Sequence, residues 1–317
     1  MMRDAALSEQ AAQELEDLLS NPHAISPTPP RDLAPRTYPT ATPTIARPGL
    51  GWLAQRPDFR DRVYAAPHQG ATLPSAIDLR PQAVPIEDQL HLGACTAFMA
   101  GRLFREARRA MYGWTDNEPQ SAHTPQGEDF AISHLYEYFW SRFLLDPNLV
   151  PVDSGSTCRD AIKVLNQYGA CAWHNYPYDI TKFAQQPPAA AQVNASHREA
   201  TSYFAVPQTL DAIKLCLTEP HPKGGRTGYP VGFGFTVYNS FFGVGADGVV
   251  PLPQPGETVA GGHAITIEGC DDARQCFIVA NQWGAGWGDR GWCYMPYSYL
   301  LNPNLASDFW TVRLVTR

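Results

Sequence analysis

Apolar residues recur at helical spacing in the first half of the globular part of the chain. Met99, Leu103, Ala107 and Met111 follow one another at four-residue intervals and predict an amphipathic helix over 95–112, with Gly113 as its stop. Similar patterns predict helices over 133–145, 157–168 and 209–217. The residues that fit the helix ends are Ser133, Thr157 and Thr209 as N-caps and Gly169 as a C-terminal stop.

After Tyr229 the pattern changes to short apolar segments that are typical of strands. These segments read PVGFGFTVY, HAITIEGC, CFIVANQW, GWCYM and FWTVRLVT. Helices that come first and strands that come second predict an α+β protein with segregated layers.

The N-terminal part has a different character. Residues 3–20 predict a short helix, and ten prolines between Asn21 and Gly70 predict an extended segment, because proline fits neither a helix interior nor a central strand. The sequence pattern typical of a folded domain begins near Leu73. We therefore expect an N-terminal segment, 1–72, and one globular part, 73–317.

Composition excludes several classes of protein. The chain has 317 residues, of which 44% are hydrophobic and 17% charged, as in globular proteins. Its net charge of −7, with no basic stripe, argues against a nucleic-acid partner, and no apolar run approaches the ~18 residues that span a membrane. The N-terminus lacks a signal-peptide core, so we expect a cytoplasmic protein or one exported without a classical signal peptide. Seven cysteines leave at least one unpaired.

Four polar residues form a candidate catalytic set. Cys95 stands at a predicted helix start, where free N–H groups favour a thiolate, although a cysteine there can also pack as a small apolar residue. His263 follows two glycines and could act as its base, while Asn281 at a strand end could orient the imidazole. Gln89, six residues before Cys95, could donate to an oxyanion.

The motifs around these residues resemble those of the papain-like cysteine peptidases, and the resemblance extends over residues 73 to about 317. Gln89 and Cys95 lie in Q-x5-C and G-x-C-x-A-F, His263 lies in GHA, and Asn281 begins N-x-W-G-x-G-W-G-x-x-G. Thr96 replaces the family's usual tryptophan and Leu92 one of its disulfide cysteines, which fits a bacterial-type member.

The resemblance implies an α+β, papain-like two-domain fold. A helical left domain would span about 88–205, and a β-barrel-like right domain about 206–317 plus 73–87, with the active-site cleft between them. Cys95 and His263 would form a thiolate–imidazolium pair with a strongly lowered Cys95 pKa, and the Cys95 N–H and the Gln89 side chain would hold the oxyanion. No cofactor or metal is implied.

The resemblance also implies a set of substrate-binding residues: Gly155, Ser156, Cys158, Gly234, Gly261, Ala264 and Trp283. Gly155 and Ser156 would pair with an extended substrate backbone, and Trp283 would cover the His263–Asn281 hydrogen bond. The other four would surround the pocket for the second residue before the cleaved bond. Because all four are small or apolar, we expect that pocket to prefer Leu, Val or Phe to charged residues by about 1–3 kcal/mol.

The expected function is cleavage of peptides or proteins through an acyl-enzyme, as an endopeptidase. A non-hydrolytic peptide-binding protein and an acyl-transferring ligase are the alternatives. Part of residues 21–60 is expected to lie over the Cys95–His263 cleft in the direction opposite to substrate and to make the chain latent, the alternatives being a disordered tail or a partner-binding arm. Cys270 and Cys276 flank a predicted turn, and a disulfide between them is left open.

Overall fold

The computed structural model describes residues 48–65, 72–112, 131–221 and 227–316. The helix predicted over 3–20 and the first part of the proline-rich segment lie outside these residues. No helix in the described ranges is long and apolar enough to cross a membrane.

The four predicted helices are confirmed. They are α2 (Cys95–Tyr112), α3 (His134–Leu145), α4 (Cys158–Gln167) and α6 (Leu210–Thr218). Ser133, Thr157 and Thr209 are N-caps as predicted, since each side-chain oxygen accepts a backbone N–H from the first turn of its helix. The sequence missed α5 (Ala189–Ala195), α7 (Asn239–Phe242) and α8 (Tyr297–Leu300), which are too short for apolar periodicity to show.

Within the described residues, seven strands form one antiparallel sheet. They are β1 (Ala76–Asp78), β2 (Ala200–Ala205), β3 (Val231–Tyr238), β4 (Val259–Asp271), β5 (Cys276–Ala280), β6 (Trp292–Pro296) and β7 (Ala306–Val315). The sheet order is β2-β7-β3-β4-β5-β6, and β1 pairs with β4. The five predicted strands are confirmed as β3 to β7. The sequence did not predict β1, which pairs with β4, or β2, which pairs with β7.

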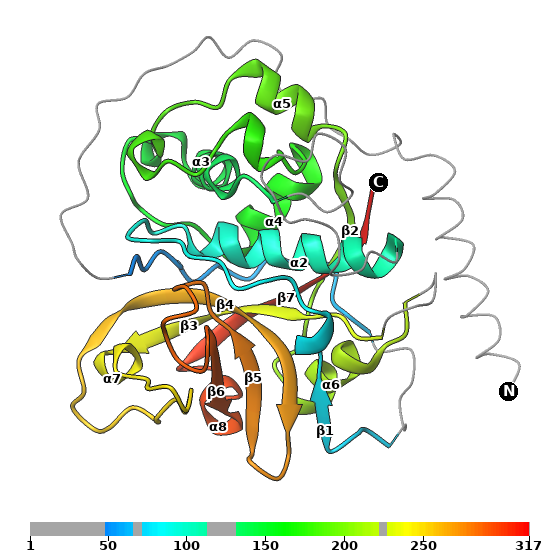
Figure 1. The fold of residues 1–317 in the computed structure, drawn as a ribbon, viewed down its shortest axis with the longest axis vertical. Helices are drawn as coiled ribbons and strands as arrows, with labels where there is room; N and C mark the ends of the chain where they lie inside the picture. Colours follow the sequence, from blue (N-terminus) through cyan, green and yellow to red (C-terminus); the bar gives the residue numbers. More distant parts are fainter. Residues whose placement is uncertain (1–47, 66–71, 113–130, 222–226, 317) are drawn as a thin grey trace, which may run out of the picture. The chain divides into compact units, whose positions relative to one another are not determined.

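The helices and the sheet form the two layers of an α+β papain-like fold, and α2 lies between them (Figure 1). It packs against α3 and α4 on one side and against β4 and β7 on the other. The predicted stripe from Met99 to Met111 lies in the buried cluster between α2, α4 and the sheet. A second buried cluster fills the space between the sheet and α6.

All seven cysteines are free and buried. The β4–β5 register pairs Cys270 with Phe277 and Asp271 with Cys276. Because neighbouring residues of a strand point to opposite faces, the Cys270 and Cys276 side chains lie on opposite sides of the sheet, in separate buried clusters. The disulfide that the sequence left open is therefore not formed.

A buried ion pair joins α2 to β4. The Arg102 Nε atom donates to Glu268 Oε1 at 2.7 Å, and the exposed fractions of the two side chains are 7% and 0%. Arg102 also donates to the Pro85 carbonyl at 3.1 Å. Since Arg102 shares α2 with Cys95 and Glu268 shares β4 with His263, this contact fixes the two candidate catalytic elements against each other.

Replacing one partner of this pair should destabilise the fold strongly. Arg102→Met leaves the Glu268 carboxylate buried without its cation, so we expect the free energy of unfolding to fall by about 3–5 kcal/mol. Urea denaturation measures the change. The free energy of unfolding of the double variant Arg102→Met/Glu268→Leu should fall by clearly less than that of Arg102→Met. Arg60→Met, which breaks an exposed ion pair with Asp58, is the control and should leave stability unchanged. Equal losses for the single and double variants would contradict the prediction.

Candidate active site

Cys95 is the first residue of α2, as predicted, and it is fully buried. The loop before it is tied to the loop that carries Gly155. The Gly93 N–H donates to the Asp153 carboxylate at 3.0 and 3.1 Å, and Asp153 accepts the Tyr138 hydroxyl, whose oxygen accepts the Gly155 N–H at 3.0 Å. The sequence did not predict a role for Asp153 or Tyr138, because neither belongs to a recognisable motif.

His263 and Asn281 form the hydrogen bond that the sequence predicted. It joins His263 Nε2 to Asn281 Oδ1 at 2.9 Å, and the Gln282 backbone N–H donates to the same oxygen at 2.9 Å. A neutral imidazole that donates through Nε2 carries an acceptor at Nδ1, and Nδ1 has no hydrogen-bond partner. The Trp283 ring lies 4.8 Å from the His263 ring, centroid to centroid, and shields this bond from water as expected.

The structure brings Cys95 beside the strand that carries His263. Backbone N–H groups of Ala264, Gly51 and Thr96 favour the Cys95 thiolate, but complete burial outweighs them and raises the pKa of the thiol to about 12. Burial likewise lowers the pKa of His263 to about 4, although the hydrogen bond that His263 donates to Asn281 acts to raise it. The lowered thiol pKa expected from the sequence is therefore wrong for this state, in which both groups are neutral at pH 7.

The segment that buries them comprises residues 48–64, here called the strap. Its backbone pairs with Ser156, since the Ser156 N–H donates to the Gly51 carbonyl at 2.8 Å and the Leu53 N–H donates to the Ser156 carbonyl at 3.0 Å. The Trp52 N–H donates to the Gly262 carbonyl, next to His263, at 3.0 Å. The strap thus pairs with Ser156, the residue predicted to pair with a substrate backbone, and the two paired segments run parallel.

The strap also occupies the predicted oxyanion donor. Gln89 Nε2 donates to the Gly49 carbonyl at 2.9 Å and to the Leu92 carbonyl at 2.8 Å. Two glycines permit this approach, because a Cβ atom on Gly49 would lie 2.1 Å from the Leu92 oxygen, and one on Gly51 1.8 Å from the Gly93 oxygen. The sequence GLGW at 49–52 is therefore the signal for the strap. These four residues are not among the motifs from which the site was predicted.

The Trp52 side chain fills a pocket that contains most of the predicted pocket residues. It packs against the buried cluster that includes Cys158 and Ala264, and a Cβ atom on Gly234 would lie 2.0 Å from its indole. Gly261 is instead nearest to Leu50 of the strap. Burial raises the pKa of Cys158 well above its ordinary value, so this cysteine acts as an apolar wall, as expected.

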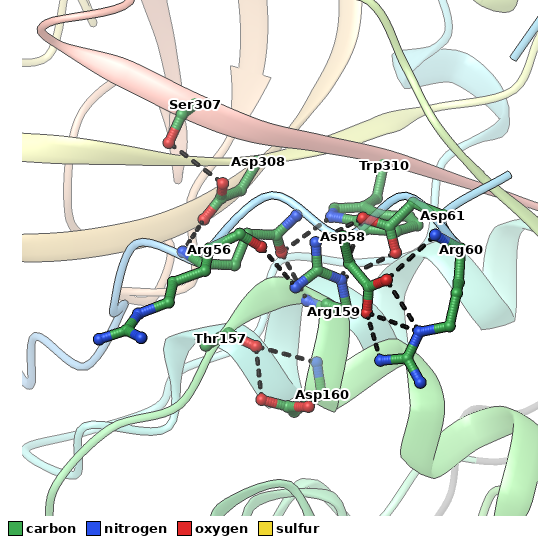
Figure 2. Close-up of polar contacts among 11 residues, drawn as sticks. Arg56, Asp58, Arg60, Asp61, Thr157, Arg159, Asp160, Ser307, Asp308 and Trp310 are labelled. Atoms are coloured by element: carbon green, nitrogen blue, oxygen red, sulfur yellow. Dashed lines mark hydrogen bonds and ion pairs between the residues drawn. The ribbon is translucent and has the colours of Figure 1, made fainter. Parts of the chain in front are cut away.

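A carboxylate that the sequence did not indicate lies at the end of this pocket. Asp308 Oδ2 accepts the Trp52 indole N–H and the Gln55 backbone N–H, both at 2.9 Å. Its other oxygen accepts the Ser307 hydroxyl at 3.2 Å (Figure 2).

Arg159 on α4 holds the next part of the strap. Its guanidinium forms an ion pair with Asp61 and donates to the Arg56 carbonyl at 2.9 Å (Figure 2). Its backbone N–H donates to the Gln55 side-chain oxygen, which also accepts the Trp310 indole N–H. These four contacts and the two to Asp308 fasten the strap at the pocket end of the site.

The opposite end of the strap borders an open pocket of about 460 Å³. It is lined by Pro48, Asn239, Phe242, Trp283 and Trp287. Across the described residues, no group of three His, Cys, Asp or Glu side chains could hold a metal ion.

Two comparisons of sequence identify relatives of the chain. The model of the papain family of cysteine proteases matches residues 153–306, which include His263 and Asn281. An uncharacterized peptidase C1-like protein of Acanthamoeba polyphaga mimivirus is 33% identical over 294 residues, which cover 87% of this chain and 89% of that protein.

Solved structures agree with this result. Xylellain, a cysteine protease from Xylella fastidiosa, shares 29% identity and superposes with a TM-score of 0.72 over 86% of this chain and 99% of its own. A procathepsin B from Trypanosoma congolense, at 16% identity and a TM-score of 0.57 over 78% of this chain and 80% of its own, shares the fold. The chain belongs to the papain family of cysteine proteases.

Proposed function

We propose that this papain-family protease is an endopeptidase held latent by its own strap. The observation that carries the proposal is that one segment occupies three places at once: Ser156, the Gly262 carbonyl beside His263, and the Gln89 amide. A substrate backbone needs the same groups, so strap and substrate exclude each other.

The direction of the strap would protect it from cleavage by Cys95. It runs from Pro48, beside Trp283, to Gln55, beside Asp308, and pairs in parallel with Ser156. Pro-segments of the family lie opposite to the direction of substrate. A reversed chain presents its carbonyl groups in an orientation unsuited to attack by the Cys95 sulfur.

Displacement of the strap starts the chemistry. Water then reaches Cys95 and His263, which removes the burial that holds both neutral and allows the proton to pass from sulfur to His263 Nδ1. The thiolate attacks the peptide carbonyl, and the Gln89 amide, freed from Gly49, donates to the oxyanion. His263, oriented by Asn281, protonates the leaving amine and then activates water against the acyl-enzyme.

Endopeptidase action is supported by the openness of the site. At the Trp283 end, the pocket lined by Phe242 and Trp287 can receive residues that follow the cleaved bond. Among the described residues, the segment that lies across the pocket end is the strap itself, so its removal leaves room for a chain on both sides of Cys95.

Weakening the strap should activate the full-length chain. Trp52→Ala removes a half-buried indole and its hydrogen bond to Asp308, which should cost strap binding about 2 kcal/mol and raise the cleavage rate of dipeptide amide substrates about 30-fold. Phe59→Ala, at a strap residue that is 98% exposed, is the matched control. Cys95→Ala in the activated chain should abolish cleavage.

Point variants are preferable to a chain that begins near Thr72. Tyr64 is buried in the sheet core and donates to Glu219 at 2.6 Å, so truncation there would also damage the fold. Equal rates for wild type, Trp52→Ala and Phe59→Ala would show that the strap does not limit activity.

Thiol reactivity should report the state of the strap. In the full-length chain Cys95 should be alkylated slowly at pH 7, because burial raises its pKa and keeps it protonated. In Trp52→Ala, alkylation should be fast and should stay fast well below pH ~8.5, the ordinary thiol pKa, as long as His263 is present. Mass spectrometry of the alkylated peptides separates Cys95 from the other cysteines. An ordinary thiol titration in Trp52→Ala that His263→Ala does not alter would refute the ion pair.

A further inference from the structure

We propose that Asp308 is a specificity-determining residue that makes the Trp52 pocket accept side chains ending in an N–H donor, above all arginine. The inference rests on the proposed function, in which this pocket receives a substrate side chain once the strap leaves. It changes the expectation from the sequence, which described an apolar pocket that disfavours charged residues of either sign.

A β-bulge places the carboxylate there. Gly234 of β3 pairs with Ser307 of β7 and Gly232 pairs with Trp310, so β7 carries one extra residue between these pairs. Asp308 lies in this bulge with φ = 60°, a conformation that aspartate adopts more readily than most residues. A bulge of this kind turns a side chain away from the regular alternation of the strand.

The pocket therefore has apolar walls and a polar end. Its walls include Cys158, Gly234 and Ala264, and Asp308 Oδ2 lies where the Trp52 indole N–H ends, 2.9 Å away. Trp52 shows which kind of side chain fits, namely an apolar body with an N–H group at its tip. Arginine has the same arrangement, with a methylene stem and several N–H donors, and adds a positive charge.

Displacement of the strap leaves this carboxylate in need of a donor. Asp308 Oδ2 then loses the N–H groups of both Trp52 and Gln55, and the carboxylate keeps only the Ser307 hydroxyl on its other oxygen, which is unfavourable for a partly buried charge. A guanidinium in the pocket replaces them, whereas a glutamate adds repulsion. Arg159, whose charge already acts to lower the pKa of Asp308, is the protein's own cation that would compete with a substrate cation for this carboxylate.

The test compares substrates in the activated full-length chain. Three peptide amides that differ only in the second residue before the cleaved bond, Leu, Arg or Glu, are assayed with Trp52→Ala and with Trp52→Ala/Asp308→Asn. We expect kcat/KM for the Arg substrate to lie within about tenfold of that for Leu, and to fall at least tenfold in the double variant. The Leu substrate should change less than threefold, and the Glu substrate should improve. Asp211→Asn in the Trp52→Ala chain, at an exposed aspartate in the first turn of α6, is the matched control.

A second substitution guards against a folding defect. Asp308→Gly suits the positive φ and should give the same loss of Arg cleavage with Leu cleavage retained. An Arg-to-Leu ratio that neither Asp308 substitution alters, as when Arg159 neutralises the carboxylate, would overturn the inference while leaving the protease function in place. Failure of Trp52→Ala to cleave any of the three substrates, with Cys95 rapidly alkylated, would instead overturn the proposed function and this inference with it.

Discussion

The site depends on the contact between one helix and one strand. Cys95 begins α2 and His263 lies on β4, so the distance between sulfur and imidazole is set by how these two elements pack. The buried Arg102–Glu268 pair and the close approach of Met99 to Gly232, where a Cβ atom would lie 2.1 Å from the Met99 sulfur, fix that packing. A shift of α2 away from β4 by the width of one methyl group would separate the candidate pair Cys95 and His263, although the helix and the strand themselves would stay intact.

Local signals explain why much of this arrangement could be predicted from the sequence. The helix starts at Ser133, Thr157 and Thr209 are encoded by a side chain and an N–H group a few residues apart, and the strands by continuous apolar segments. The hydrogen bond between His263 and Asn281 follows from motifs that the family shares. Such features need no knowledge of distant residues.

What could not be predicted depends on contacts between distant parts of the chain. Asp308 looks like an ordinary strand residue until the pairing with β3 reveals the bulge. The sequence led us to expect part of residues 21–60 over the cleft, but it did not show which residues make the contact, because the fit of Gly49 and Gly51 against the Leu92–Gly93 backbone depends on the fold. The neutral state of Cys95 and His263 follows from burial by that same segment, which no motif around either residue encodes.

The anchor of the strap at Tyr64 makes the contact between the strap and the site intramolecular. Tyr64 is buried in the sheet core and Val63 pairs with Ala205, so the strap's far end is part of the folded body. When residues 48–56 detach, they remain tethered a few residues from the site, at an effective concentration in the millimolar range. Under the proposed latency, the covered and open states would be in a unimolecular equilibrium whose position is independent of protein concentration, and a peptide substrate would shift it by mass action. A cut between Gln55 and Tyr64 would remove this tether and make release of the strap effectively permanent through dilution.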